Sequence, residues 1–221
     1  MRCLPYNRFQ LKVLKGVQGQ VRLKLQQICR EAVGPGASHL VTRETGQAVR
    51  SHIARTLGDL EPGAVVTLDF TGVGVVDFSF ADECLAKLLT RLIAGEYGVK
   101  YLRLTGLGAS QRENVQVALE RKRLPALLVH ADDTWDCLGT ITPHLRETLT
   151  TVMSRRQVSA RDLAGLLDLE LTASSTRLGA LHRQRLVRRR ERPIEEGGRE
   201  FVYEGLVAAP GHETGGAESR V

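Results

Sequence analysis

Three short apolar segments alternate with amphipathic stretches in the middle of this chain, and this alternation constrains the fold most. Residues 64–70, 100–105 and 125–129 are short and rich in β-branched or aliphatic side chains, as buried strands are. Residues 80–94 and 110–123 lie between them, and their apolar side chains recur at helical spacing. Strands that alternate with helices predict a parallel or mixed sheet layered by helices.

The segments on either side of this core divide the chain further. Residues 45–60 place apolar side chains on one helical face, and residues 7–30 suggest a strand followed by a helix. After Trp135 the pattern changes to helices alone and then a single hairpin. We therefore place the domain boundary near residues 132–141. The expected regions are a basic N-terminal segment (1–36), an α/β domain with a mixed sheet (37–135), a mainly helical domain (141–206) and a disordered tail (207–221).

The basic charge of the chain is concentrated in two places. The formal net charge is +6, yet the first 30 residues carry seven Lys or Arg and no Asp or Glu. Local basic patches attract polyanions by releasing condensed counterions. Each segment is therefore a candidate phosphate contact, and for each the alternative is an ordinary solvated surface. The second concentration places six arginines within ten residues, at Arg183, Arg185, Arg188, Arg189, Arg190 and Arg192.

Several classes of protein are disfavoured by composition. Four cysteines stand far apart without a C-x-x-C pair, which argues against a zinc or redox site and fits a reducing cytoplasm. Aromatic residues make up 5%, few for a protein that stacks single-stranded bases. No apolar run approaches the roughly 18 residues that a membrane span needs. The N-terminus lacks the apolar core of a secretory signal, while its basic, acid-poor composition leaves an organelle transit peptide as an alternative.

The sequence contains no recognisable motif for catalysis or for a cofactor. Asp69, Asp77 and Asp82 lack a histidine partner and a metal-ligand spacing. Gly106 and Gly108 suggest a phosphate loop, but no Gly-Lys-Ser/Thr follows them. We therefore expect neither an enzyme, nor a bound metal, nor a cofactor.

The C-terminal domain is expected to begin with three helices. Residues 144–152 form the first, with apolar side chains on one face. Ser159, followed three residues later by Asp162, starts the second helix as a capping box. Thr172 is the expected N-cap of the third helix, over residues 173–184.

The third helix has two contrasting faces. Ser174, Leu178 and Leu181 share the face that packs inward. Small polar side chains on the other face let a helix enter the major groove of DNA, where hydroxyls and arginine reach base edges. Ser175 and Arg177 flank that face, within reach of phosphates. Its members are Thr172, Thr176, Gly179, Ala180 and Arg183.

A basic hairpin follows, with strands near 186–190 and 200–204 around a glycine turn. Residues 159–206 (SARDLAGLLDLELTASSTRLGALHRQRLVRRRERPIEEGGREFVYEGL) resemble winged helix-turn-helix repressors of the MarR and ArsR kinds. The resemblance implies binding to double-stranded DNA, with the third helix in the major groove and the wing on the backbone. The implied DNA-binding residues are Thr172, Ser175, Thr176, Arg177, Arg183, Arg188, Arg189, Arg190, Arg192, Gly197, Gly198 and Arg199.

One residue departs from that family pattern. Arg185 stands where such domains often have glycine just before the first wing strand. A left-handed turn costs arginine more than glycine, so we expect a different local turn here. Glu195, Glu196 and Glu200 near the wing repel phosphates, and they favour the alternative that this domain serves protein contact or dimerisation.

The stretch LDFTGVGVVDFSFADE at residues 68–83 resembles the STAS domains of anti-sigma-factor antagonists, and more closely a bacterial STAS-like family of unknown function. The resemblance covers roughly residues 40–130. It implies regulatory phosphorylation of Ser79 by a partner kinase, with Asp69 and Asp77 as the two aspartates of the motif. Phe78 and Phe80 depart from the small residues of that motif. The alternative is that Ser79 caps the helix, with Asp82 completing a capping box.

Together these features predict a cytoplasmic, bacterial DNA-binding transcriptional regulator with a STAS-like domain and a winged helix-turn-helix. We expect a homodimer, because one recognition helix gives limited affinity and paired half-sites follow two-fold symmetry. The STAS-like domain would bind a kinase, another protein partner or a second copy of itself. The alternative function is a partner-switching interaction protein of the anti-sigma-antagonist kind, without DNA binding.

Overall fold

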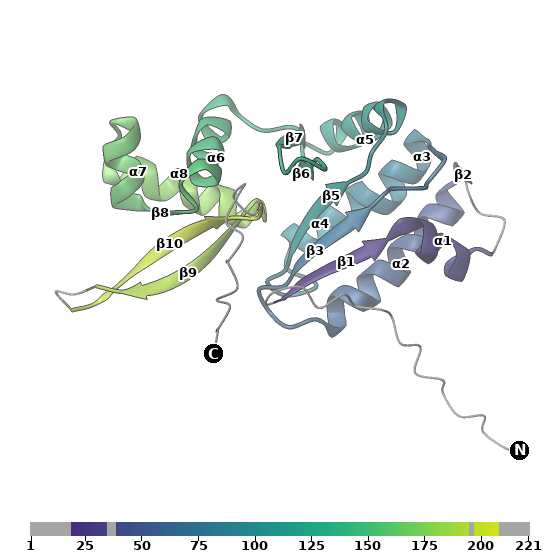
Figure 1. Ribbon diagram of the computed structural model, residues 1–221, viewed down its shortest axis with the longest axis horizontal. Helices are drawn as coiled ribbons and strands as arrows, with labels where there is room; N and C mark the ends of the chain where they lie inside the picture. Colours follow the sequence, from purple (N-terminus) through teal and green to yellow (C-terminus); the bar gives the residue numbers. More distant parts are fainter. Residues whose placement is uncertain (1–18, 35–38, 195–196, 208–221) are drawn as a thin grey trace, which may run out of the picture.

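The computed structural model describes residues 19–34, 39–194 and 197–207. Its larger part contains a five-stranded sheet with the order β1-β3-β5-β6-β7 (Figure 1). The first four strands run parallel, and β7 pairs antiparallel with β6, so the prediction of a mixed sheet is confirmed. The strands are β1 (Gln20–Lys24), β3 (Val65–Asp69), β5 (Tyr101–Thr105), β6 (Pro125–Val129) and β7 (Trp135–Gly139).

Most of the basic N-terminal segment (1–18 and 35–36), Glu195 and Glu196 of the hairpin, and the tail from 208 to 221 lie outside the described residues. Among the described residues, no helix is both long and apolar enough to cross a membrane.

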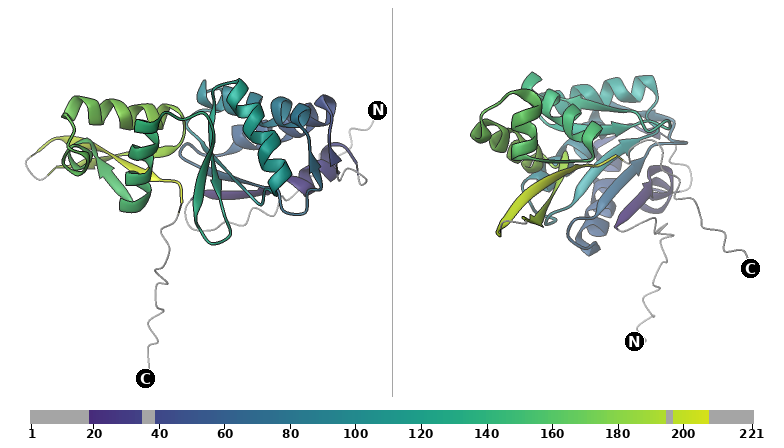
Figure 2. Two further views of the ribbon diagram at one scale, coloured as in Figure 1. Left: turned by 90° about the horizontal axis from the view of Figure 1, so that it is seen from above. Right: turned by 60° about the vertical axis from the view of Figure 1, so that its left-hand side comes forward.

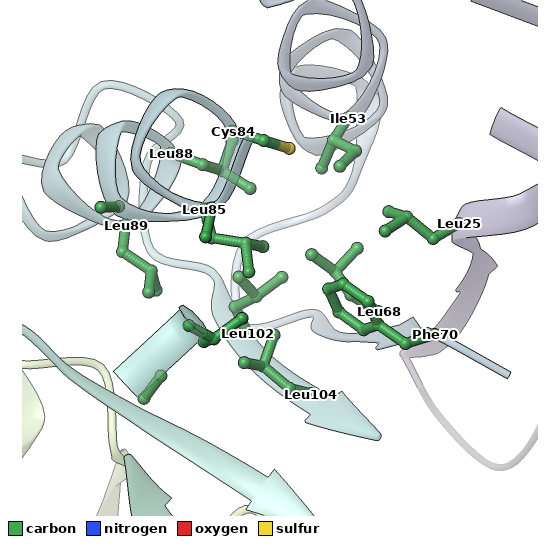
Figure 3. Close-up of a cluster of buried hydrophobic side chains, with 14 of the residues drawn as sticks. Leu25, Ile53, Leu68, Phe70, Cys84, Leu85, Leu88, Leu89, Leu102 and Leu104 are labelled. Carbon is green, nitrogen blue, oxygen red and sulfur yellow. The ribbon is translucent and has the colours of Figure 1, made fainter. Parts of the chain in front are cut away.

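Helices cover one face of the five-stranded sheet (Figure 1). Alternate strand residues point into this layer, because successive side chains of a strand face opposite sides. Figure 3 shows Leu68, Leu102 and Leu104 of the sheet facing Leu85 and Leu88 of the helices. The layer consists of α1 (Leu25–Ala32), α2 (Arg43–Asp59), α3 (Phe78–Phe80), the π-helical segment η1 (Ala81–Ala86), α4 (Lys87–Ile93) and α5 (Ala109–Arg121).

The π-helical segment η1 holds a buried carboxylate. Glu83 accepts hydrogen bonds from Arg50 of α2, at 3.0 Å, and from Lys87. Gly46 of α2 lies against it, and a Cβ added there would sit 3.0 Å from the Cβ of Glu83. A buried charge needs paired partners, and the ion pair with Arg50 joins α2 to η1.

The C-terminal part contains three helices and a three-stranded antiparallel sheet with the order β8-β10-β9. The predicted capping box is confirmed, because Ser159 accepts from the Asp162 amide at 3.2 Å and Asp162 accepts from the Ser159 amide at 2.8 Å. The elements are α6 (Pro143–Arg155), β8 (Gln157–Ser159), α7 (Ala160–Leu167), α8 (Leu171–Arg183), β9 (Val187–Pro193) and β10 (Arg199–Gly205).

The second face of the five-stranded sheet is buried against the C-terminal part. Val65, Tyr101 and Leu127 belong to one apolar cluster with Leu149 and Val187. These sheet residues alternate with those that face the helical layer. The two parts lie side by side in Figure 2 and share this core, so the C-terminal part packs on the second face of the sheet.

Four strands were absent from the sequence prediction. Trp135 opens β7, so the prediction of helices alone after this residue is wrong. β7 is an edge strand that is only half-buried, and its pattern of apolar residues is correspondingly weak. The strand β8 is too short for its apolar periodicity to be recognised. The same holds for β2 (His39–Leu40) and β4 (Val75–Val76), which pair in parallel with each other.

Candidate nucleic-acid interface

The two faces of α8 are arranged as the sequence predicts. Ser174, Leu178 and Leu181 are buried against the rest of the C-terminal part. On the opposite side the small polar residues and the terminal cation are open to solvent. Thr172, Ser175, Thr176 and Arg183 are exposed, and Gly179 and Ala180 are half-buried.

The start of α8 differs from the prediction by two residues. The helix begins at Leu171 with Glu170 at the N-cap, so Thr172 is not the capping residue. Thr172 instead uses its backbone carbonyl to accept a hydrogen bond from the Thr176 hydroxyl, at 2.8 Å. Thr172 thereby joins the exposed face one turn before Thr176.

The two arginines of α8 have different surroundings. Arg177 lies 3.1 Å from the carboxylate of Glu147 on α6, and its side chain is mostly buried. Arg183 is exposed and its guanidinium folds back along Gly179, where a side chain would meet it at 3.5 Å. In the part of the chain that the structure describes, Arg183 makes no ion pair, so it is the cation of this helix that a phosphate can reach most easily.

The hairpin arginines are paired within the hairpin itself. The strand register puts Arg188 opposite Glu204 and Arg192 opposite Glu200. Arg192 donates to Glu200 at 3.1 Å, and Arg190 lies 3.2 Å from Glu204. Cross-strand pairs of opposite charge are neighbours in an antiparallel ladder, and the spacing of these residues in sequence does not reveal them.

Two further hairpin arginines, Arg189 and Arg199, also have partners within the hairpin. The guanidinium of Arg189 lies over the ring of Phe201 at 4.2 Å, and Arg199 lies 3.1 Å from Glu191. Gly197 and Gly198 have positive φ and form the exposed tip. Four described hairpin arginines thus face three glutamates, because Arg188 and Arg190 share Glu204, while Arg189 contacts a ring and no carboxylate, so the basic charge of the hairpin is reduced rather than cancelled. Exposed ion pairs are weak, so a phosphate can replace these glutamates at small cost.

Arg185 adopts the left-handed turn that glycine usually makes. Its φ is +62°, so the expectation of a different turn is wrong. Its side chain offsets part of the strain by donating to the carbonyl of Leu92, at 3.4 Å, where α4 nears its end. The Leu92 carbonyl also accepts from the Gly95 amide, and a cation is favoured at the negative end of the helix dipole.

Two further contacts hold the C-terminal part on the sheet. The Tyr101 hydroxyl lies 3.5 Å from Nδ1 of His182, and Arg103 donates to the carbonyl of Leu206 at 2.6 Å. Burial, assisted by nearby arginines, lowers the pKa of His182, while a hydrogen bond with the Val187 carbonyl opposes this shift. The imidazole is thus neutral at pH 7 and fits between two tyrosine rings.

The helix within the STAS-like motif, α3, is capped by Asp77 and not by Ser79. Asp77 is the N-cap of α3 and accepts from the Phe80 amide at 2.7 Å. Ser79 is the second residue of that helix and half-buried, so the alternative that Ser79 and Asp82 form a capping box is wrong. Asp82 lies instead 3.2 Å from Arg43 of α2.

Asp69 lies apart from this cap, at the end of β3. It is buried, accepts from the Thr71 amide at 2.9 Å and lies 3.5 Å from Arg22. The described contacts of Asp69 share no residue with those of Asp77. The structure therefore does not join the two aspartates and Ser79 into one cluster.

The three cysteines within the described residues, Cys29, Cys84 and Cys137, are buried. Burial raises the pKa of the Cys29 and Cys137 thiols to about 11, and it raises the pKa of Cys84 further. These three thiols are therefore protonated at neutral pH. Within the described ranges, no three His, Cys, Asp or Glu side chains come together as metal ligands would.

Comparison with family models, curated proteins and solved structures found no match for this chain.

Proposed function

We propose that this chain is a DNA-binding transcriptional regulator in which α8 enters the major groove of a duplex. The observation that carries the proposal is the exposed, small and polar face of α8, which ends in Arg183. Helices that face only solvent usually carry Glu and Lys, whereas this face carries hydroxyls and glycine. Such a face lets the helix backbone approach base edges closely.

The surroundings of α8 support a winged helix-turn-helix. Helices α6, α7 and α8 are followed by a hairpin, and the short strand β8 pairs with that hairpin on β10. The hairpin extends away from the α/β part in Figure 1 and leaves the outer face of α8 uncovered. In this proposal β9 and β10 are the wing, and the sheet of residues 20–139 with its helices is a STAS-like module.

In this proposal the α/β module is packed firmly against the DNA-binding part rather than joined to it by a flexible linker. It shares an apolar core with α6 and α8, and Tyr101 and Leu92 contact the C-terminal end of α8 and the turn after it. Partner binding or modification of the module, at Ser79 for instance, would therefore be transmitted through packed contacts. A dimer would pair two α8 helices with two half-sites.

The experiment is a titration of mixed-sequence duplex DNA at about 50 mM and about 200 mM salt, followed by fluorescence anisotropy. The wild type is expected to bind at low salt and to lose affinity steeply at the higher concentration. Arg183→Ala should weaken binding about threefold to tenfold and lower the salt slope by about 1. Absence of binding at low salt would refute the proposal.

One observation favours a second candidate function, an interaction protein without a DNA role. The described hairpin arginines are all engaged by glutamates or by Phe201, which reduces the attraction of the wing for phosphates. A homodimer measured by analytical ultracentrifugation, together with absence of duplex binding at low salt, would favour this candidate over the first.

A further inference from the structure

Three arginines outside the hairpin remain open to solvent. Arg155 ends α6, Arg156 follows it with a φ of +65°, and Arg161 lies in the first turn of α7. All three are exposed, and none makes an ion pair or a side-chain hydrogen bond among the described residues. In this respect they differ from the arginines of the hairpin.

A hollow of about 520 Å³ is lined by residues of the end of α6, β8 and α7, and two of these arginines are among them. Arg155 and Gln157 line it from the segment before α7, and Arg161 lines it from α7 itself. Gly165 lies one turn after Arg161, and a side chain added there would meet no atom within 4 Å. The hollow therefore exists partly because residue 165 lacks a side chain.

The hollow lies close to the proposed DNA-binding face. Helix α7 packs directly on α8, and Ser159, the residue just before α7, pairs with Val202 of the hairpin strand β10. Hydrogen bonding with Glu200, together with the charge of nearby Asp162, raises the pKa of Arg192. A duplex seated on α8 would thus have its backbone pass near α7 on the same side as the wing.

We propose that this hollow holds a phosphate of the duplex backbone, with Arg155 and Arg161 as its ligands and Arg156 beside them. The inference rests on the proposed function and adds a backbone contact outside α8 and the hairpin. Guanidinium groups donate in a planar fork that matches phosphate oxygens. Asp162 also lines the hollow, but the Ser159 amide holds its carboxylate, and among the described residues it makes no ion pair with Arg155 or Arg161.

The test measures duplex affinity and its salt slope for four variants. Gly165→Leu fills the hollow without a change of charge, and Arg155→Ala with Arg161→Ala removes the two cations. Gly165→Ala is the control for helix propensity, and Arg55→Ala, on the exposed side of α2, is the control for charge. Leucine favours a helix over glycine, so urea unfolding should show Gly165→Leu at least as stable as the wild type.

Gly165→Leu and the double arginine variant should each bind about threefold to tenfold more weakly, with a salt slope lower by about 1 to 2. Gly165→Ala and Arg55→Ala should stay within about twofold of the wild type. If Arg183→Ala weakens binding while both hollow variants bind like the wild type, the inference is wrong and the proposed function stands. If the wild type binds no duplex at low salt, both the proposed function and this inference are wrong.

Discussion

Nε of Arg185 lies 3.4 Å from the carbonyl oxygen of Leu92, a residue 93 positions earlier in the chain. This contact joins the turn between α8 and β9 to the last residues of α4. Arg185 also holds a left-handed backbone conformation that glycine adopts more easily. One side chain thus links the proposed recognition helix to the α/β module and offsets the local strain that its own backbone creates.

Replacement of Arg185 separates these two roles. Arg185→Ala loses the contact with Leu92 and keeps the strained left-handed backbone. Arg185→Gly also loses the contact, but glycine adopts this backbone conformation without strain. The alanine variant should therefore be less stable than the glycine variant by about 1 kcal/mol, as measured by urea unfolding. Equal stabilities would show that residue 185 does not hold this turn in solution.

Gly139, at the end of β7, should tolerate no side chain. Its φ is +76°, and an added Cβ would clash with the carbonyl oxygen of Leu124. Gly95 is the matched control, because its φ is +86° and an added Cβ would meet no atom within 4 Å.

Gly95→Ala should cost about 1 kcal/mol of unfolding free energy, from backbone strain alone. Gly139→Ala should cost more than about 3 kcal/mol, because the steric clash is added. Comparable losses in thermal or urea unfolding would contradict the packing described between β6 and β7.

The sheet and the inward face of α8 were predictable because apolar residues recur at fixed spacing. Val66 and Leu68 alternate along β3, and Leu178 and Leu181 lie one turn apart. The pairing of Arg192 with Glu200 was not predictable, because it depends on the register of two strands around a turn. The N-cap of α3 was predicted wrongly for another reason. Asp77 and Ser79 both stand near the start of α3 and can both cap a helix, and periodicity does not distinguish them; in the structure Asp77 is the N-cap.

Glu83 should make stability depend on pH in the acidic range. Burial alone would raise its pKa, but hydrogen bonds from Lys87 and Arg50 outweigh burial and hold the pKa below its ordinary value of 4.5. A depressed carboxyl pKa stabilises the fold above that ordinary value, and the contribution is lost as pH falls through the folded pKa.

The wild type should therefore be more stable than Glu83→Gln at pH 7, and the difference should shrink near about pH 3. Urea unfolding at the two pH values measures it. A difference that is the same at both would mean that the Glu83 ion pairs do not set the acid sensitivity.

Glu200→Gln should strengthen duplex binding. The change removes the carboxylate that neutralises Arg192 and leaves the guanidinium available to a phosphate. Affinity for mixed-sequence duplex should rise about threefold, and the salt slope should steepen by up to about 1. Glu113→Gln, an exposed change of equal charge on α5, should have little effect. Equal gains for the two variants would indicate a general charge effect rather than a wing contact.

The central claim is that the outer face of α8 contacts a DNA duplex. Thr176 and Ser51 are both exposed helical residues whose hydroxyls donate to the carbonyl four residues earlier, one on α8 and the other on α2. Substitution of either by glutamate adds one negative charge. Fluorescence anisotropy with duplex DNA at about 50 mM salt should show binding weakened more than about tenfold for Thr176→Glu and within about twofold of the wild type for Ser51→Glu. Equal affinity of the two variants, or no duplex binding by the wild type, would contradict the claim.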